Sequence, residues 1–251
     1  MRKTFVRCSC ALIFVLAAWG APILPTSYTG PNGGTGFFTY YDDSYSGVGS
    51  TTTPYATLSG GTGQLTDGAT VTTNWFENAA PWVGWLVIPF DLSGNRCLVG
   101  VDPNCHPGLG ENPRFTFLFG ASQPFGTLSV HVDDSNGFGG VRPPLAVEVL
   151  GETAGVFTYS KLFNLVDPVT SDPKWYDLDV TGLSTDRVIV RLLYRDAWIF
   201  ADEIRFDSAV VGGAISGVTV SAPVTNSPEP GSMVLLSLGL AGVTLLRRKR
   251  A

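Results

Sequence analysis

Basic residues are scarce in the central part of this sequence, and their scarcity limits the partners it can have. Residues 22–227 contain 9 Lys and Arg against 20 Asp and Glu, a formal net charge of −11. A surface that binds nucleic acid neutralises phosphates with Lys and Arg, so this balance argues against nucleic acid as a partner. It is typical of a soluble exported domain and is compatible with binding of divalent cations.

Histidine is also rare, since the chain contains only His106 and His131. The sequence has no zinc-binding helix motif, no Gly-x-Ser-x-Gly nucleophile elbow and no phosphate-binding loop. Adjacent acids such as Asp202 and Glu203 point to opposite faces of a strand, so they do not by themselves form the paired carboxylates of a glycosidase. The sequence therefore predicts that the protein is not an enzyme.

Cysteine is the third scarce residue, with four in the chain and only Cys97 and Cys105 beyond the N-terminal segment. An even number of cysteines in an exported chain favours a disulfide. The turn-forming run Asp102-Pro103-Asn104 lies between the two and lets the chain double back. The alternative is a pair of free thiols; together with His106 they are too few for a zinc site.

The N-terminus has the order of a secretory signal peptide. Arg2, Lys3 and Arg7 precede an apolar run over residues 11–18, and small residues follow it. The apolar run is too short to span a bilayer, and a basic start followed by small residues is typical of a cleaved leader. We expect residues 1–21 to be a signal peptide rather than a short buried helix.

Long helical periodicity is absent, and short strand-like runs separated by Gly, Pro, Asn and Asp take its place. Several alternate between apolar and polar residues, which is typical of antiparallel sheets with one face in water. About ten such runs predict an all-β fold, an antiparallel β-sandwich or jelly roll. The runs are residues 37–41, 70–75, 82–90, 115–119, 127–132, 145–150, 155–161, 174–180, 187–193 and 198–206.

Three of these stretches, in order, make residues 45–206 resemble the discoidin-like, galactose-binding-like family, which includes factor 5/8 type C domains and carbohydrate-binding modules. They are "QLTDGATVTTNW" from Gln64, "WVGWLVIPFDLSG" from Trp82 and "RVIVRLLYRDAWIFADEIRF" from Arg187. The resemblance implies an eight-stranded galactose-binding-like jelly roll. We expect this domain over residues 26–206, followed by a linker over residues 207–226.

The same resemblance implies a structural Ca²⁺ ion. The family holds it with backbone carbonyls, the acid of the Asp-Gly segment and a glutamate of the closing strand. Many relatives have a second acid two residues after the aspartate, where this sequence has Ala69. The alternative is that Asp67-Gly68 is only a turn. The candidate ligands are Asp67 and Glu203, with Leu65, Thr72 and Asp202 as weaker candidates.

Tryptophan is abundant, and aromatic faces stack on sugar rings. The alternative for each tryptophan is a place in the sandwich core, and we favour that alternative for Trp85 and Trp198. In the family that the sequence resembles, ligands bind on loops at one end of the sandwich, which here are residues 77–82 and 133–144. The candidate ligand-binding residues are Trp82, Asp133, Asp134, Asn136, Phe138 and Arg142.

The C-terminal segment, residues 227–251, has a triplet, an apolar run and a basic end. The run over residues 231–246 has 16 residues without a charge. At about 1.5 Å per residue it is marginal for a hydrocarbon core about 30 Å thick, so we expect a transmembrane helix of minimal length. Its basic end belongs on the cytoplasmic side. The triplet is Pro228, Glu229 and Pro230, and the basic residues are Arg247, Arg248, Lys249 and Arg250.

This order resembles the PEP-CTERM sorting signal of Gram-negative bacteria that produce exopolysaccharide. The resemblance implies a transient anchor in the inner membrane, cleavage by an exosortase-type membrane protease, and release to the cell surface or extracellular matrix. We therefore expect a non-catalytic exported protein that binds carbohydrate or exopolysaccharide. The alternatives are a structural matrix protein without a specific ligand and, less favoured, a secreted hydrolase.

Overall fold

The computed structural model describes residues 20–87 and 111–209. These residues form nine β-strands and two 3₁₀ helices, η1 (Gln64–Thr66) and η2 (Phe138–Gly140). Within the described ranges, no helix has the length and apolar character that a membrane span requires. The predicted signal peptide, disulfide, linker and membrane helix fall outside these ranges, apart from a few residues at their borders.

The strands form one antiparallel network that divides into two sheets. Sheet A has the order β3-β9-β4-β7, and sheet B has the order β2-β1-β4-β8-β5-β6. The prediction of an all-β antiparallel fold is confirmed. The strands are β1 (Ser27–Pro31), β2 (Thr57–Gly61), β3 (Val83–Leu86), β4 (Arg114–Val132), β5 (Ala146–Thr153), β6 (Val156–Asn164), β7 (Lys174–Asp179), β8 (Ser184–Leu193) and β9 (Trp198–Ser208).

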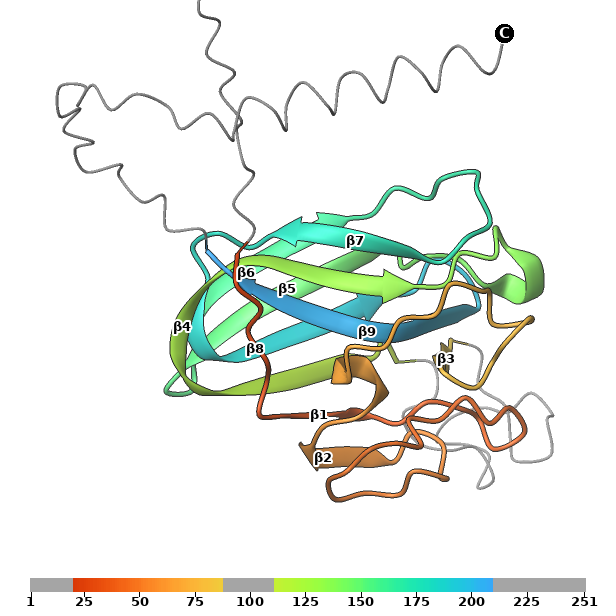
Figure 1. Ribbon diagram of the computed structural model, residues 1–251, viewed down its shortest axis with the longest axis horizontal. Coiled ribbons are helices and arrows are strands. Elements are labelled where there is room, and N and C mark those ends of the chain that lie inside the picture. The colour runs from red at the N-terminus through yellow and green to blue at the C-terminus, as the bar shows by residue number, and fades with distance from the viewer. Residues whose placement is uncertain (1–19, 88–110, 210–251) are drawn as a thin grey trace, which may run out of the picture. The chain divides into compact units, whose positions relative to one another are not determined.

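Strand β4 belongs to both sheets. Its first half pairs with β1 and β8, and its second half pairs with β7 and β9. Figure 1 shows the strand curving at its middle between the two sheets. Registers shift between Leu118 and Gln123 and again between Phe125 and Thr127, as expected where a strand bends out of one ladder into another. The rings of Phe119 and Phe125 fill the inside of this bend.

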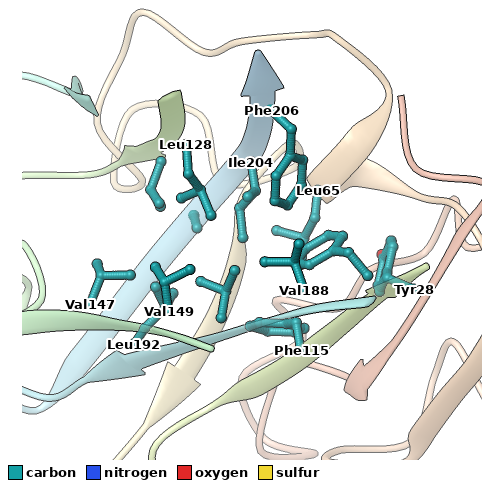
Figure 2. Close-up of a cluster of buried hydrophobic side chains, with 14 of the residues drawn as sticks. Tyr28, Leu65, Phe115, Leu128, Val147, Val149, Val188, Leu192, Ile204 and Phe206 are labelled. Atoms are coloured by element: carbon teal, nitrogen blue, oxygen red, sulfur yellow. The ribbon is translucent and has the colours of Figure 1, made fainter. Parts of the chain in front are cut away.

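The core lies between the two sheets and follows the period of two along the strands. On β4 and β9, Leu128, Val130 and Ile204 are at most 1% exposed. Sheet B contributes buried residues such as Val149 and Val190 to the same cluster. Figure 2 shows side chains from both sheets meeting in this layer. The apolar and polar residues that alternate along residues 127–132 and 187–193 thus point in turn to the core and to the outer face of their sheet.

Two predicted strands are wrong, residues 37–41 and 70–75. Both have aromatic or β-branched residues, but their backbone N–H groups do not pair with a neighbouring strand. The N–H of Val71 donates to the Asp202 carboxylate at 2.6 Å, and that of Trp75 donates to the Asp133 carboxylate at 2.7 Å. Buried acids therefore satisfy donors that a strand would have satisfied.

Two further boundaries differ from the sequence prediction. Residues 115–119 and 127–132 are one strand, because the chain stays extended through Gly120 and Gly126. Strand β2 was not among the predicted runs, since its glycines weaken the strand signal in "TLSGG".

A second apolar cluster packs β3 and the segment before it against the start of β9. It contains Trp82, Leu86 and Val141 together with Trp198 and Phe200. The rings of Phe38, Tyr40 and Trp75 pack against it from loops. This cluster fixes the loops at one end of the sandwich, where most of the predicted ligand residues lie.

Candidate functional site

Asp133 joins the two loops that carry the predicted ligand residues. The residue follows directly after β4. Its carboxylate accepts hydrogen bonds from the N–H of Trp75 at 2.7 Å and from the Ser135 hydroxyl at 3.1 Å. The residue is fully buried, and burial raises the pKa of its carboxyl to about 6 despite these two donors. Asp133 is therefore a structural clamp beneath the loop surface.

Above this clamp lies a surface cluster of three aromatic residues, Trp75, Phe76 and Phe138, called the aromatic cluster below. Phe138 is 62% exposed and Phe76 is 47% exposed, with ring centroids 5.0 Å apart. Trp75 stacks beneath Phe138 at 6.3 Å and lies nearly parallel to the buried ring of Phe200 at 5.6 Å. The exposed rings are thus held on a rigid aromatic base.

Gly139 allows the close approach of the two loops. Its φ of +66° is one that side chains rarely adopt, and a Cβ there would lie 2.6 Å from the Trp75 ring. The indole N–H of Trp75 is buried without a hydrogen-bond partner in the described part of the chain.

Two polar side chains, Asn136 and Arg142, flank Phe138 in the sequence of its loop. The Arg142 guanidinium lies 2.7 Å from the Asp167 carboxylate and 3.5 Å from that of Asp196. Asn136 is exposed with a φ of +49°, and its side-chain amide donates to the Val169 carbonyl at 3.3 Å. A hydrophobic platform with polar neighbours has the chemistry to bind a molecule that has both apolar faces and hydroxyl groups.

The six predicted ligand residues separate into two groups. Asn136, Phe138 and Arg142 lie together at the loop surface, whereas Asp133, Asp134 and Trp82 are 0% exposed. Asp134 accepts the N–H of Asn136 at 3.0 Å and forms an ion pair with Lys174 at 2.6 Å. Trp82 donates its indole N–H to the Thr73 carbonyl at 3.2 Å and stacks on His131 at 5.8 Å.

Sequence reasoning missed the role of Trp75 and Phe76 in this surface. The run "NWFEN", which puts two aromatic residues among polar ones just before the predicted loop, was the available signal. Exposed pairs of large aromatic residues on a loop are typical of binding surfaces, because leaving them in water is unfavourable.

Two of the five predicted calcium ligands come close to each other. Glu203 accepts the N–H of Gly68 at 3.0 Å, and burial raises the pKa of Glu203 to about 7, with the neighbouring Asp67 charge adding to the shift. No group of three or more His, Cys, Asp or Glu in the described residues has the arrangement of a metal site. A cation there would therefore depend on backbone oxygens for further ligands.

The other three calcium candidates have different surroundings. The Leu65 side chain belongs to the main core, and Thr72 is exposed. Asp202 lies 2.5 Å from Nδ1 of the buried His131 and accepts the N–H of Val71. Its two carboxylate oxygens are thus already bound within the protein.

Comparison with known proteins identifies the C-terminal segment. Residues 228–250 match the family model of the PEP-CTERM protein-sorting motif, which confirms the sorting segment predicted from Pro228, Glu229 and Pro230. The motif indicates an exported protein that is sorted via the membrane. No curated protein matches the chain.

Several solved structures are similar to part of this chain at low sequence identity. A GH31 CBM32-2 bound to GalNAc is 15% identical, with a TM-score of 0.33 over 58% of this chain and 85% of that one. The lectin domain of lectinolysin, complexed with Lewis B antigen, is 10% identical, with a TM-score of 0.38 over 58% and 82%. An F5/8 type C domain from Bacteroides fragilis is 10% identical, with a TM-score of 0.29 over 57% and 98%.

Proposed function

We propose that this protein is an exported, non-catalytic carbohydrate-binding protein whose loop-end aromatic cluster contacts exopolysaccharide at the cell surface or in the extracellular matrix. The observation that carries the proposal is the exposed pair Phe76 and Phe138 above the half-buried Trp75 and the buried Phe200. Sugar rings have one apolar face that packs on such rings. Asn136 and Arg142 lie nearby to bond hydroxyl groups.

The sorting motif supports the choice of partner. A chain with the PEP-CTERM motif at residues 228–250 is exported and sorted via the membrane. We propose that an exosortase-type protease of the inner membrane of a Gram-negative bacterium releases it. Polysaccharide is then the polymer that it meets outside the cell.

The exposed aromatic residues also distinguish this proposal from a structural matrix protein without a ligand. That alternative expects all tryptophans in the core. Trp82, Trp85 and Trp198 are buried, whereas Trp75 and Trp175 are half-buried. Phenylalanine rather than tryptophan provides the exposed aromatic surface. We regard the 62% exposure of Phe138 at the loop end as favouring a ligand.

The direct test measures binding of polysaccharide extracted from the native matrix to the full-length chain in neutral detergent. We expect Phe138→Ala to weaken binding by about tenfold or more, because a central aromatic contact typically contributes at least about 1.4 kcal/mol. Phe157→Ala is the matched control, since Phe157 is 56% exposed on the edge strand β6. No binding by the wild type, or equal losses in both variants, would refute the proposal.

We also propose a structural Ca²⁺ ion between Asp67 and Glu203. Two carboxylates brought together beside the Thr66–Gly68 backbone suit a hard cation with oxygen ligands. The ion would neutralise repulsion between the two acids and link the loop after η1 to strand β9.

A further inference from the structure

The outer face of sheet A carries a second feature, a groove of about 670 Å³. Strands β4, β7 and β9 form its floor, residues 22–25 form one wall and residues 66–68 close one end. Residues 21–23 bond to residues 206–208 at the C-terminal end of β9, so this wall is attached to the sheet. None of the residues of the aromatic cluster lines the groove.

Sheet register arranges the floor as a grid. Asp177, Ser129 and Arg205 lie side by side on β7, β4 and β9, and Trp175 and Asp207 lie one row away on either side of them. Neighbouring strands are about 4.8 Å apart and successive rows about 7 Å apart, so these side chains share one surface. The Ser129 hydroxyl donates to Asp177 at 2.6 Å.

The groove has an excess of negative charge. Its lining contains four acidic residues and one basic residue, Arg205. The acids are Asp67, Asp177 and Asp207, together with Glu203, whose pKa burial raises to about 7. No ion pair within 4.0 Å involves any of these five residues in the described part of the chain. The carboxylates therefore attract a cation from outside, and the low-dielectric wall strengthens that attraction.

Arg205 shows that the groove already accepts a cation on an aromatic face. Its guanidinium carbon lies 4.1 Å from the Trp175 ring centroid, within the range of a cation–π interaction. The side chain of Arg205 is exposed, so it can move off the ring. A ligand with a positive charge and an apolar face can take its place between Trp175 and the carboxylates.

We infer that this groove binds a glycan chain that carries free amino groups, with a sugar ring against Trp175 and ammonium groups beside Asp177 and Asp207. This inference rests on the proposed carbohydrate-binding function and adds to it a second site and a charge class. A volume of about 670 Å³ lies within the range of small-ligand sites and suits a few sugar rings.

The test compares two oligomers of equal length, a glucosamine hexamer and an N-acetylglucosamine hexamer, by calorimetry with the full-length chain in neutral detergent. The first carries ammonium groups and the second is neutral. We expect the wild type to prefer the cationic oligomer by about tenfold or more, and the preference to shrink as salt is raised.

Variants of the groove residues test which side chains cause the preference for the cationic oligomer. Asp177→Asn with Asp207→Asn should abolish it. Trp175→Ala should weaken binding of both oligomers, whereas Arg205→Ala should strengthen cationic binding severalfold because it frees the ring. The control pair Asp172→Asn with Asp186→Asn removes the same charge from exposed positions outside the groove. Unchanged melting temperatures show that the variants are folded.

Several results would overturn the inference. Equal affinity for the two oligomers excludes a charge-selective groove, and a Lys-rich peptide that binds as tightly as the glucosamine hexamer excludes glycan selectivity. If calcium binds at Asp177 and Asp207 and neither oligomer binds, the groove is a cation site only. If Phe138→Ala removes all binding and the groove variants leave binding unchanged, only the loop-end site stands. If the groove variants remove all binding and Phe138→Ala leaves it unchanged, the loop-end site is refuted and the groove stands.

Discussion

Asp133 shows how one buried residue can support a candidate binding surface from beneath. Its carboxylate accepts the Trp75 N–H and the Ser135 hydroxyl, so it fixes both loops of the aromatic cluster. Burial nevertheless disfavours its charged form and raises its pKa to about 6. The hydrogen bonds and the desolvation act in opposite directions, and the raised pKa shows that desolvation is larger.

The raised pKa makes a prediction about stability and pH. The folded chain keeps the Asp133 proton up to about pH 6, whereas the unfolded chain loses it near pH 4. The unfolded state thus binds fewer protons between these values, and Asp133 lowers the free energy of unfolding as pH rises through this window. Above about pH 6 Asp133 is ionised in both states, and its contribution to the free energy of unfolding no longer changes with pH.

We expect Asp133→Asn to remove this slope, because an amide cannot ionise and its oxygen still accepts the Trp75 N–H. Relative to the variant, the wild type should lose roughly 2 to 3 kcal/mol between about pH 4 and pH 7. Urea unfolding at several pH values measures this difference. Parallel curves for the two proteins would contradict the prediction.

At the scale of elements, the two candidate binding surfaces are positioned in different ways. The groove depends on the register of β4, β7 and β9, which brings Trp175, Asp177 and Arg205 onto one face. The aromatic cluster lies on loops, and buried contacts with Asp133 and Phe200 hold it in place. A change in strand register would move the groove residues to the other face.

The proposed calcium ion links two elements, the loop after η1 and strand β9. If it binds, saturating calcium should raise the melting temperature by several degrees over the chelated protein, because a ligand of the folded state alone stabilises that state. Asp67→Asn should remove most of this increase. Asp172→Asn, which changes an exposed acid outside the site, should keep it. A melting curve that chelator does not change would rule out the ion.

At the scale of the whole molecule, the sorting motif bears on where the proposed binding surfaces would act. Glu229 is the central residue of the Pro-Glu-Pro triplet within the matched residues 228–250. We expect Glu229→Ala to leave an uncut chain in the membrane fraction, where the wild type gives a shorter product at the surface or in the matrix. Cell fractionation with immunoblotting measures both forms.

A matched control for this experiment is Glu111→Ala, which removes an exposed acid far from the triplet in sequence. It should be processed like the wild type. Normal cleavage and surface delivery of the Glu229→Ala chain would show that the triplet does not direct processing.

The sequence alone determined the sorting segment and the fold class. Pro228, Glu229 and Pro230, followed by an apolar run and a basic end, are a local order that needs no tertiary contact to be recognised. Alternation along residues 127–132 and 187–193 likewise predicted antiparallel strands, because the side-chain period of a strand is a local property. The predicted strand at residues 70–75 failed where buried carboxylates accepted the backbone donors instead. The run at residues 37–41 also failed, and there the N–H of Phe38 donates to the Thr35 hydroxyl.

Only the tertiary structure decided which aromatic residues face water. Trp82 and Phe138 both belong to predicted binding loops, yet one is fully buried and the other is 62% exposed. Burial depends on packing against distant residues such as His131 and Trp198, which no local pattern reveals. The groove has the same origin, since Trp175 and Arg205 are 30 positions apart in sequence and become neighbours only through the pairing of β7 and β9 with β4.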